Sequence, residues 1–181
     1  NQNDEGVGEQ RNEQTVAHVQ MVARLDATTR LCDLVFPATH NSGTYETAKG
    51  SSRVRFDGVE KSVRVIQNLP LDAFVLCQEK SVLDQLRMGI RCLDLRVAYS
   101  AVSSEVWVVH AIPTVLCARV FDDIRAFLAE SKTEFVLVRI KAGWEHLCTW
   151  KTAEAFRAFD EGKSKHLGKD FVVLPKQFAG R

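Results

Sequence analysis

Four short apolar segments, each carrying polar residues at or near its end, constrain this chain more than any other feature. They are Leu34–His40 (LVFPATH), Arg91–Val97 (RCLDLRV), Val106–His110 (VWVVH) and Phe135–Lys141 (FVLVRIK). Runs of this length that are rich in Val, Leu and Ile are typical of strands buried on both faces. Stretches with helical periodicity, at about 79–89 and 118–130, separate some of them. The alternation predicts an α/β fold with parallel strands joined by right-handed crossovers.

The ends of these segments carry chemically useful side chains. In a parallel α/β barrel, residues at the carboxyl ends of successive strands converge on one active site. The residues that would meet there are His40, Asp94, Arg96, His110 and Lys141. Imidazoles move protons near neutral pH, and cations stabilise developing negative charge. The pattern therefore predicts acid–base chemistry on a phosphate ester.

Composition narrows the class of protein. A chain of 181 residues fits one domain, and a hydrophobic content of 45% is enough for a sizeable core. The net charge of +1 gives no reason to expect a nucleic acid partner. No apolar run reaches the roughly 18 residues of a membrane-spanning helix. The 5 cysteines include no CxxC pair, which favours reduced thiols over a disulfide framework.

The chain is expected to divide into a short leader and one domain. Residues 1–15 are polar, which predicts a disordered leader, and 16–181 is the predicted catalytic domain. A helix near 152–159 and a further strand at 171–175 (FVVLP) are also expected. The first residue is Asn rather than Met, so the removal of a signal peptide or upstream domain stays open as an alternative. Reduced cysteines favour a cytoplasmic or peripheral membrane location over secretion.

The ordered motifs THNSGTY, SVLDQLRMGIRCLDLRV, VWVVHAIP and EFVLVRIK resemble the X domain of phosphatidylinositol-specific phospholipase C. The resemblance covers roughly Leu34–Lys141 and is closest to the metal-independent branch of bacterial and trypanosomal type. It implies a TIM-barrel-like fold of the phospholipase C phosphodiesterase type. It also implies cleavage of phosphatidylinositol or glycosylphosphatidylinositol lipids, at a peripheral membrane surface, to diacylglycerol and inositol 1,2-cyclic phosphate.

The resemblance also implies roles for individual residues. His40 matches the general base that deprotonates the inositol 2-hydroxyl, and His110 matches the general acid that protonates the departing diacylglycerol oxygen. Asp94 matches the carboxylate that supports the acid histidine. Lys141 matches a basic residue near the headgroup. Asn41 stands where many secreted bacterial members have an aspartate and calcium-dependent members have an asparagine ligand, and we expect both residues to bind substrate.

Two arginines bear on metal dependence. Arg96 matches the arginine that bacterial-type members use where calcium-dependent members use a carboxylate ligand, and Arg139 also lies on a strand that supplies a carboxylate in those enzymes. A cation repels Ca²⁺, which needs several oxygen ligands. The sequence therefore predicts an enzyme without a metal or any other cofactor.

The length of the chain is a departure from the family. A complete (β/α)₈ barrel needs about 200–250 residues, whereas about five strands are visible here. In the family, the second half of the barrel supplies an aspartate that orients the base histidine. We expect the N-terminal half of a barrel, or a truncated barrel, completed by a partner chain or by a C-terminal half beyond Arg181.

Two alternatives stay open at this point. The first is an X domain that binds inositol phospholipid headgroups without turnover, which retained lipid binding with no measurable cleavage would identify. The second is a glycerophosphodiester phosphodiesterase, whose pattern has HRG at the first strand and paired acidic metal ligands. This chain has HNSG and Asp-x-Arg instead.

Overall fold

A computed structural model describes residues 21–22, 25–48, 75–131, 133–142 and 153–168. The elements are η2 (Leu31–Asp33), β1 (Ala38–Thr39), α3 (Val82–Arg87), β2 (Cys92–Ser100), β3 (Glu105–His110), β4 (Ile112–Leu116), α4 (Cys117–Glu130), β5 (Leu137–Ala142) and α5 (Ala153–Leu167). The expected leader at 1–15 and the expected strand at 171–175 lie outside the described residues. Within the described residues, no helix is long and apolar enough to cross a membrane.

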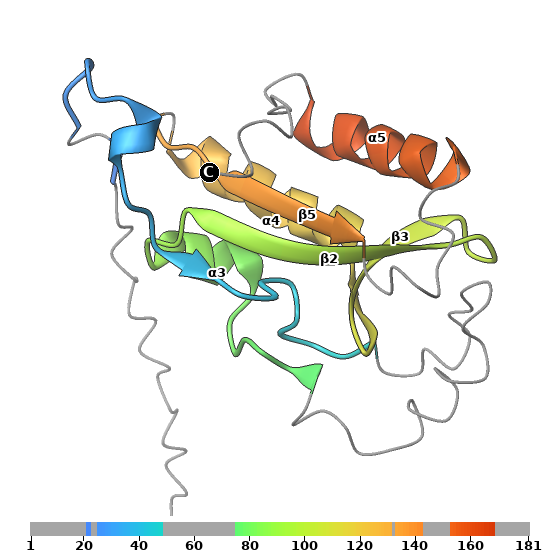
Figure 1. Ribbon diagram of the computed structural model, residues 1–181. Helices are drawn as coiled ribbons and strands as arrows, with labels where there is room; N and C mark the ends of the chain where they lie inside the picture. Colours follow the sequence, from blue (N-terminus) through green and yellow to red (C-terminus); the bar gives the residue numbers. More distant parts are fainter. Residues whose placement is uncertain (1–20, 23–24, 49–74, 132, 143–152, 169–181) are drawn as a thin grey trace, which may run out of the picture.

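Strand β2 is the centre of the sheet. It pairs in parallel with β1 through Ala38 and Cys92, and in parallel with β5 along six residue pairs that begin at Cys92 and Leu137. Strands β3 and β4 continue the sheet in antiparallel fashion. Helices α4 and α5 lie along one side of β2 and β5 (Figure 1). The result is the curled sheet of a half-barrel with its outer helices, which confirms the expected barrel-like α/β fold.

The expectation that 106–110 forms a parallel strand is wrong. Strand β3 runs antiparallel to β2, with Val97 opposite Val108 and Ser100 opposite Glu105. The connection between them is the four-residue turn 101–104, whereas a parallel crossover needs a dozen or more residues. Because β3 folds back along β2, His110 returns toward the middle of β2. Strand β4 follows at once and was not expected from the sequence.

The two expected helices over 79–89 and 118–130 are confirmed as α3 and α4. Ser81 caps α3 by accepting a hydrogen bond from the Asp84 amide, and Gly89 ends the turn with a φ of 107°. Helix α4 has a buried stripe at helical spacing: Cys117, Val120, Phe121, Ile124 and Phe127. Complete burial raises the pKa of the Cys117 thiol to about 12, so this thiol stays neutral and acts as a small apolar group.

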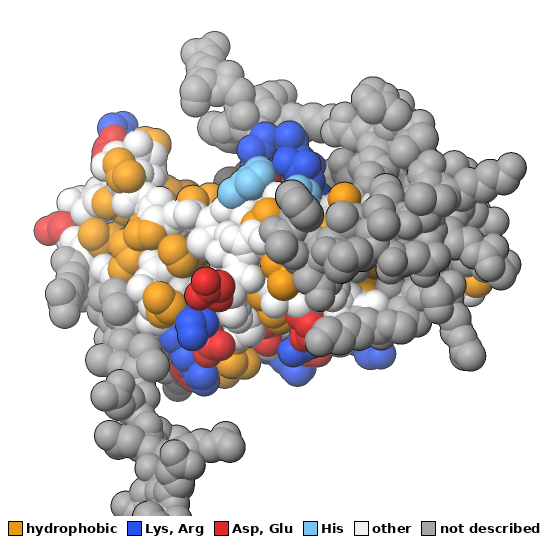
Figure 2. Space-filling model, turned by 90° about the horizontal axis from the view of Figure 1, so that it is seen from below, with side chains coloured by type: hydrophobic (Ala, Val, Ile, Leu, Met, Phe, Trp, Pro, Cys, Tyr) orange, Lys and Arg blue, Asp and Glu red, His pale blue; other side chains and the backbone are white. Residues whose placement is uncertain are grey.

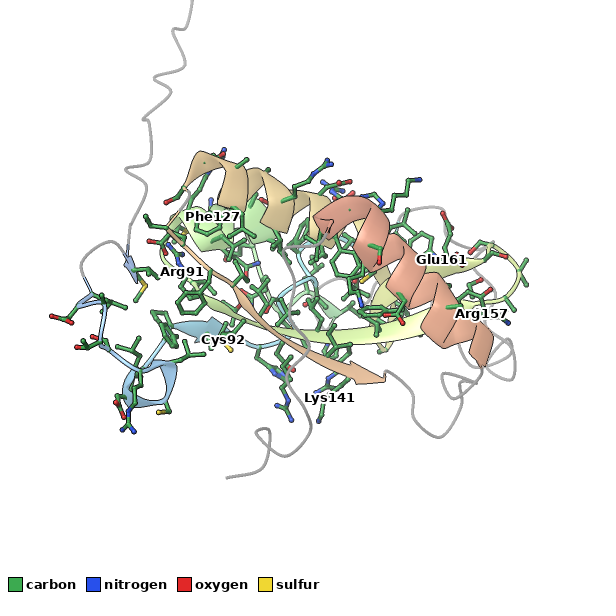
Figure 3. The ribbon with its side chains drawn as sticks, turned by 90° about the horizontal axis from the view of Figure 1, so that it is seen from above. Arg91, Cys92, Phe127, Lys141, Arg157 and Glu161 are labelled. Carbon is green, nitrogen blue, oxygen red and sulfur yellow. The ribbon has the colours of Figure 1, made fainter. Side chains whose placement is uncertain are left out.

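The alternating side chains of β2 separate the core from the opposite side of the sheet. Leu93, Leu95 and Val97 have no exposed surface and pack into the core formed with α3 and α4. The other face of the two parallel strands, hereafter the inner face, carries Cys92, Asp94, Arg96, Arg139 and Lys141. Figure 3 shows Cys92 and Lys141 on the side of the sheet away from α4, and Arg91 and Phe127 on the α4 side.

Arg91, the residue before β2, makes a fully buried ion pair with Glu134, at 2.6 Å between Nε and Oε2. Its Nη1 donates to the carbonyl oxygens of Leu86 and Ile90 at 2.7 and 2.8 Å. The guanidinium lies over the Phe127 ring, 4.5 Å from the ring centre. One side chain thus joins α3, α4 and the segments that lead into β2 and β5.

We predict that Arg91→Ala lowers the free energy of unfolding by about 3–5 kcal/mol, because it leaves the Glu134 carboxylate buried without its partner. Urea denaturation followed by circular dichroism measures this. Arg125→Ala is the control, since Arg125 makes an exposed pair on α4 and its loss should cost less than about 0.5 kcal/mol. Replacing both partners, as Arg91→Met with Glu134→Leu, should recover much of the loss. Equal costs for the two arginine variants would contradict the assignment.

Candidate active site

The turn after β1 is attached to β2 through the main chain of Asp94. The Ser42 amide donates to the Asp94 carbonyl at 2.9 Å, and the Asp94 amide donates to Ser42 Oγ at 2.9 Å. Gln85, buried on α3, supports the same turn by donating to the Ser42 carbonyl at 2.9 Å and accepting from Thr39 Oγ1 at 2.8 Å. These contacts fix the position of His40, which begins the turn.

Two residues of the HNSG motif are needed for the shape of this turn. Asn41 has a φ of 50°, a left-handed conformation that Asn tolerates better than most residues. A Cβ on Gly43 would come within 3.0 Å of a methyl group of Val108, so the turn lies directly against β3. The shape of the turn therefore explains the residue types at these two positions, apart from any chemical role of the motif.

His40 and Asp94 are in direct contact. Nδ1 of His40 lies 2.9 Å from Oδ2 of Asp94, and the side chains are 65% and 15% exposed respectively. An ionised carboxylate only accepts hydrogen bonds, so this geometry assigns a proton to Nδ1 and leaves the Nε2 lone pair free. Arg139 on β5 approaches the second oxygen of Asp94 at 4.0 Å. The arrangement suits a histidine that accepts a proton at Nε2.

His110, at the end of β3, is held by different groups. Its Nδ1 lies 3.0 Å from the Val75 carbonyl oxygen and 3.5 Å from Cys77 Sγ. Since a carbonyl oxygen only accepts, Nδ1 carries a proton here as well, and Nε2 is left to hold or release another. Asn41 Nδ2 contacts Cys77 Sγ at 3.4 Å. A chain of contacts through Asn41 and Cys77 therefore leads from the His40 turn to His110.

The partner of Asp94 differs from the expectation. The resemblance implied that Asp94 supports the acid histidine, but the structure pairs its carboxylate with His40. The reason is the pair of hydrogen bonds between Ser42 and the Asp94 main chain, which places His40 against β2. His110 lies next to the Val75 carbonyl instead.

The structure also locates the other expected site residues. Arg96 and Lys141 are neighbours on β2 and β5, in register on the inner face. Asn41 is 1% exposed and lies beneath the turn rather than at its surface. Figure 2 shows histidine side chains beside a group of Lys and Arg side chains on one face of the molecule. No contact in the described residues joins the two histidines directly.

Within the part of the chain that the structure describes, three buried polar atoms in this region have no hydrogen-bond partner: Asn41 Oδ1, Asp94 Oδ1 and Arg96 Nε. Buried polar groups are usually paired with protein groups or ordered water, so water or a polar ligand would complete these contacts. Burial, with a smaller contribution from the Asp94 charge, raises the pKa of the Cys92 thiol, which keeps Cys92 neutral. The described residues hold no group of three or more His, Cys, Asp or Glu side chains arranged for a metal ion.

Sequence reasoning gave no role to several residues that build the site. Ser42 and Gln85 position the His40 turn, and Gln78 Nε2 donates to the His40 carbonyl at 2.8 Å. The available signals were the position of Ser42 two residues after the histidine, of Gln78 shortly before α3 and of Gln85 within it. The contact between His110 and the Val75 carbonyl could not be predicted from the sequence, because every residue has a main-chain carbonyl.

Comparison of the sequence with known proteins gives one informative relative. No family model matches the chain. Over 96 residues it is 35% identical to a PI-PLC X domain-containing protein of Dictyostelium discoideum, a match that covers 53% of this chain and 16% of that protein.

The fold is also similar to solved structures of a phosphatidylinositol-specific phospholipase C. A Staphylococcus aureus phosphatidylinositol-specific phospholipase C with incorporated pentafluoro-Phe matches with a TM-score of 0.55 and 19% identity, over 81% of this chain and 43% of that one. A histidine-to-tyrosine variant of the same enzyme gives a TM-score of 0.54 at 20% identity, over 80% and 42% of the two chains. The chain thus spans less than half the length of these structures and about a sixth of the curated relative. The sequence match confirms the resemblance to the X-domain family, and the structural matches show a shared fold.

The His40–Asp94 contact generates a prediction about the imidazole tautomer. In neutral His40 the proton should reside on Nδ1, and Asp94→Ala should shift it toward Nε2, because the acceptor at Nδ1 is lost. Long-range ¹H–¹⁵N correlation spectra distinguish the two tautomers. Asp160→Ala, which removes an exposed carboxylate on α5, should leave the His40 signals unchanged. An unaltered tautomer in Asp94→Ala would show that the contact does not set the proton position.

Proposed function

We propose that this relative of the phosphatidylinositol-specific phospholipase C X domains cleaves phosphatidylinositol or glycosylphosphatidylinositol lipids by general base and general acid catalysis. Family resemblance and fold point to a phospholipase C-like phosphodiesterase. The observation that carries the finer proposal is the His40–Asp94 contact, next to Arg96 on the same strand face. The products would be diacylglycerol and inositol 1,2-cyclic phosphate.

The first half of the reaction uses His40. Its free Nε2 takes the proton of the inositol 2-hydroxyl as that oxygen attacks phosphorus. Asp94, paired to Nδ1, stabilises the imidazolium that forms. Because Asp94 is mostly buried, its charge is screened less by water than that of a surface carboxylate.

The second half uses His110 and the cations of the inner face. The protonated imidazole of His110 gives its Nε2 proton to the glycerol oxygen as the phosphorus–oxygen bond to that oxygen breaks. Arg96 offers a planar fork of donors to the phosphate oxygens, and Lys141, its neighbour on β5, adds a second positive charge. The charge that develops on phosphate in the transition state thus faces fixed cations.

A second candidate function is headgroup binding without turnover. The chain spans less than half of the solved structures it resembles. The resemblance implies that the second half of a complete barrel supplies an aspartate that orients the base histidine. Vesicle binding measured together with product release separates the two: binding without release of the cyclic phosphate supports this second function.

The division of roles between the histidines is testable with two substrates. His40→Ala and His110→Ala should each lower the rate of lipid cleavage by a factor on the order of 10²–10⁴. On an inositol phosphate ester with a phenol-like leaving group, His110→Ala should be partly rescued, because that group departs without a proton. His40→Ala should not be rescued, because the attacking hydroxyl still needs its base.

The matched control for these variants is His166→Ala. His166 contacts Asp122 of α4 and lies away from the inner face, so lipid cleavage should be unchanged. Equal losses for the His40 and His110 variants on both substrates would show that the two residues do not divide base and acid roles.

Lipid cleavage should continue when divalent metal ions are chelated. Arg96 and Arg139 place positive charge on the inner face, which opposes the binding of a divalent cation. We predict the same rate of lipid cleavage with and without excess EDTA at constant ionic strength. Activity that disappears with EDTA and returns on titration with Ca²⁺ would contradict a metal-independent mechanism.

A further inference from the structure

The thiol of Cys77 lies among hydrogen-bond donors beside His110. Cys77 is exposed, and its Sγ lies 3.5 Å from His110 Nδ1 and 3.4 Å from Asn41 Nδ2. In its thiol form it can donate to the Val75 carbonyl oxygen at 3.7 Å. Because His110 Nδ1 carries a proton, two N–H groups approach the sulfur. Such donors stabilise a thiolate, which is the nucleophile in exchange with a disulfide.

The other cysteines in the described part of the chain have different surroundings. Cys117 is completely buried, and burial raises the pKa of the Cys92 thiol, so both are poor nucleophiles. Cys32 is exposed, but the polar group beside its sulfur is the carboxylate of Asp33, at 3.7 Å, rather than an N–H donor. Among these four thiols, Cys77 is therefore the best placed for exchange.

We propose that Cys77 is a site of reversible modification by a small-molecule disulfide, and that the group it acquires prevents His110 from delivering its proton. In the exchange, the Cys77 thiolate attacks one sulfur of the disulfide, and the S–S bond of that molecule breaks. Cys77 is oxidised to a mixed disulfide, while the other half of the reagent is reduced and leaves as a thiol with the proton that Cys77 lost. The effect on His110 rests on the proposed function, whereas the site of modification does not.

The position of the sulfur explains the effect on His110. An S–S bond of about 2.05 Å places the incoming sulfur next to the imidazole, since Cys77 Sγ already lies 3.5 Å from Nδ1. The added group competes for space with the ring, whose orientation depends on the Val75 carbonyl. Cys77 is held in place, because its amide donates to the Thr44 carbonyl at 3.1 Å. The His40 ring is bonded to Asp94 instead, so the general base should be disturbed less.

The side chain of Asn41 points to the kind of group that is added. Asn41 is 1% exposed and its amide ends at the Cys77 sulfur, yet its Oδ1 has no hydrogen-bond partner within the described residues. A thiol that carries amide N–H groups, as a small cysteine-containing peptide does, brings a donor to this place. The chemistry therefore favours the disulfide of such a peptide as the reagent.

The experiment treats the fully reduced protein with glutathione disulfide and locates mixed disulfides by peptide mass spectrometry. We expect modification at Cys77, a loss of lipid cleavage of at least about tenfold, and recovery after treatment with dithiothreitol. Cleavage of the inositol phosphate ester with a phenol-like leaving group should fall much less, because that group departs without a proton from His110. An equal loss on both substrates would contradict an effect through His110.

Two serine variants serve as matched controls. Cys77→Ser should lose less than about twofold of its own lipid cleavage under the same treatment, because it has no thiol to exchange. Cys32→Ser removes the other exposed cysteine and should lose activity as the wild type does. A Cys77→Ser variant that is inactivated like the wild type, or an unmodified Cys77 in the treated wild type, would overturn the proposal.

A measurement without turnover separates this inference from the proposed function. Long-range ¹H–¹⁵N spectra should show the His110 ring signals shifting when Cys77 is modified, while those of His166, which contacts Asp122, stay unchanged. If these shifts occur but neither substrate is cleaved before treatment, the modification site stands and the proposed activity fails. If the untreated protein cleaves lipid but Cys77 stays unmodified, the activity stands and this inference fails.

Discussion

The buried ion pair between Arg91 and Glu134 is the constraint on which the described architecture depends. Its members lie at the two places where the chain enters the parallel strands β2 and β5, and the guanidinium also contacts α3 and α4. A buried charge is strongly destabilising unless it is paired. Separating the starts of β2 and β5 would therefore cost a large free energy. The register of these two strands, which decides the neighbours on the inner face, is stabilised at this point.

The site follows from that register by alternation. Because Leu93, Leu95 and Val97 face the core, Asp94 and Arg96 must face the other side of the sheet. The same alternation on β5 places Arg139 and Lys141 beside them. The chemistry therefore lies on the face opposite the helices, as expected for the interior of a barrel, although the polar residues here are not all at strand ends.

The sequence predicted the helices and strands better than it predicted how the strands pair. Apolar runs and helical periodicity predicted β5, α3 and α4, because those signals are local. The antiparallel course of β3 was missed, although the short 101–104 connection is visible in the sequence, because an apolar run gives no strand direction. Positions near strand ends placed His40 and Asp94 in one predicted site but did not predict their direct contact. The ion pair of Arg91 and the role of Ser42 depend on partners 43 and 52 residues away. Such partners leave no periodic pattern.

The hairpin of β2 and β3 has a mechanical consequence. The His40 turn is clamped to the main chain of Asp94, and His110 lies on a strand hydrogen-bonded to the far end of the same β2. The main chains that carry both imidazoles are therefore attached to one strand, although the His110 ring also contacts Val75 and Cys77. A substitution that displaces β2 should therefore alter both histidine positions at once, rather than one of them alone.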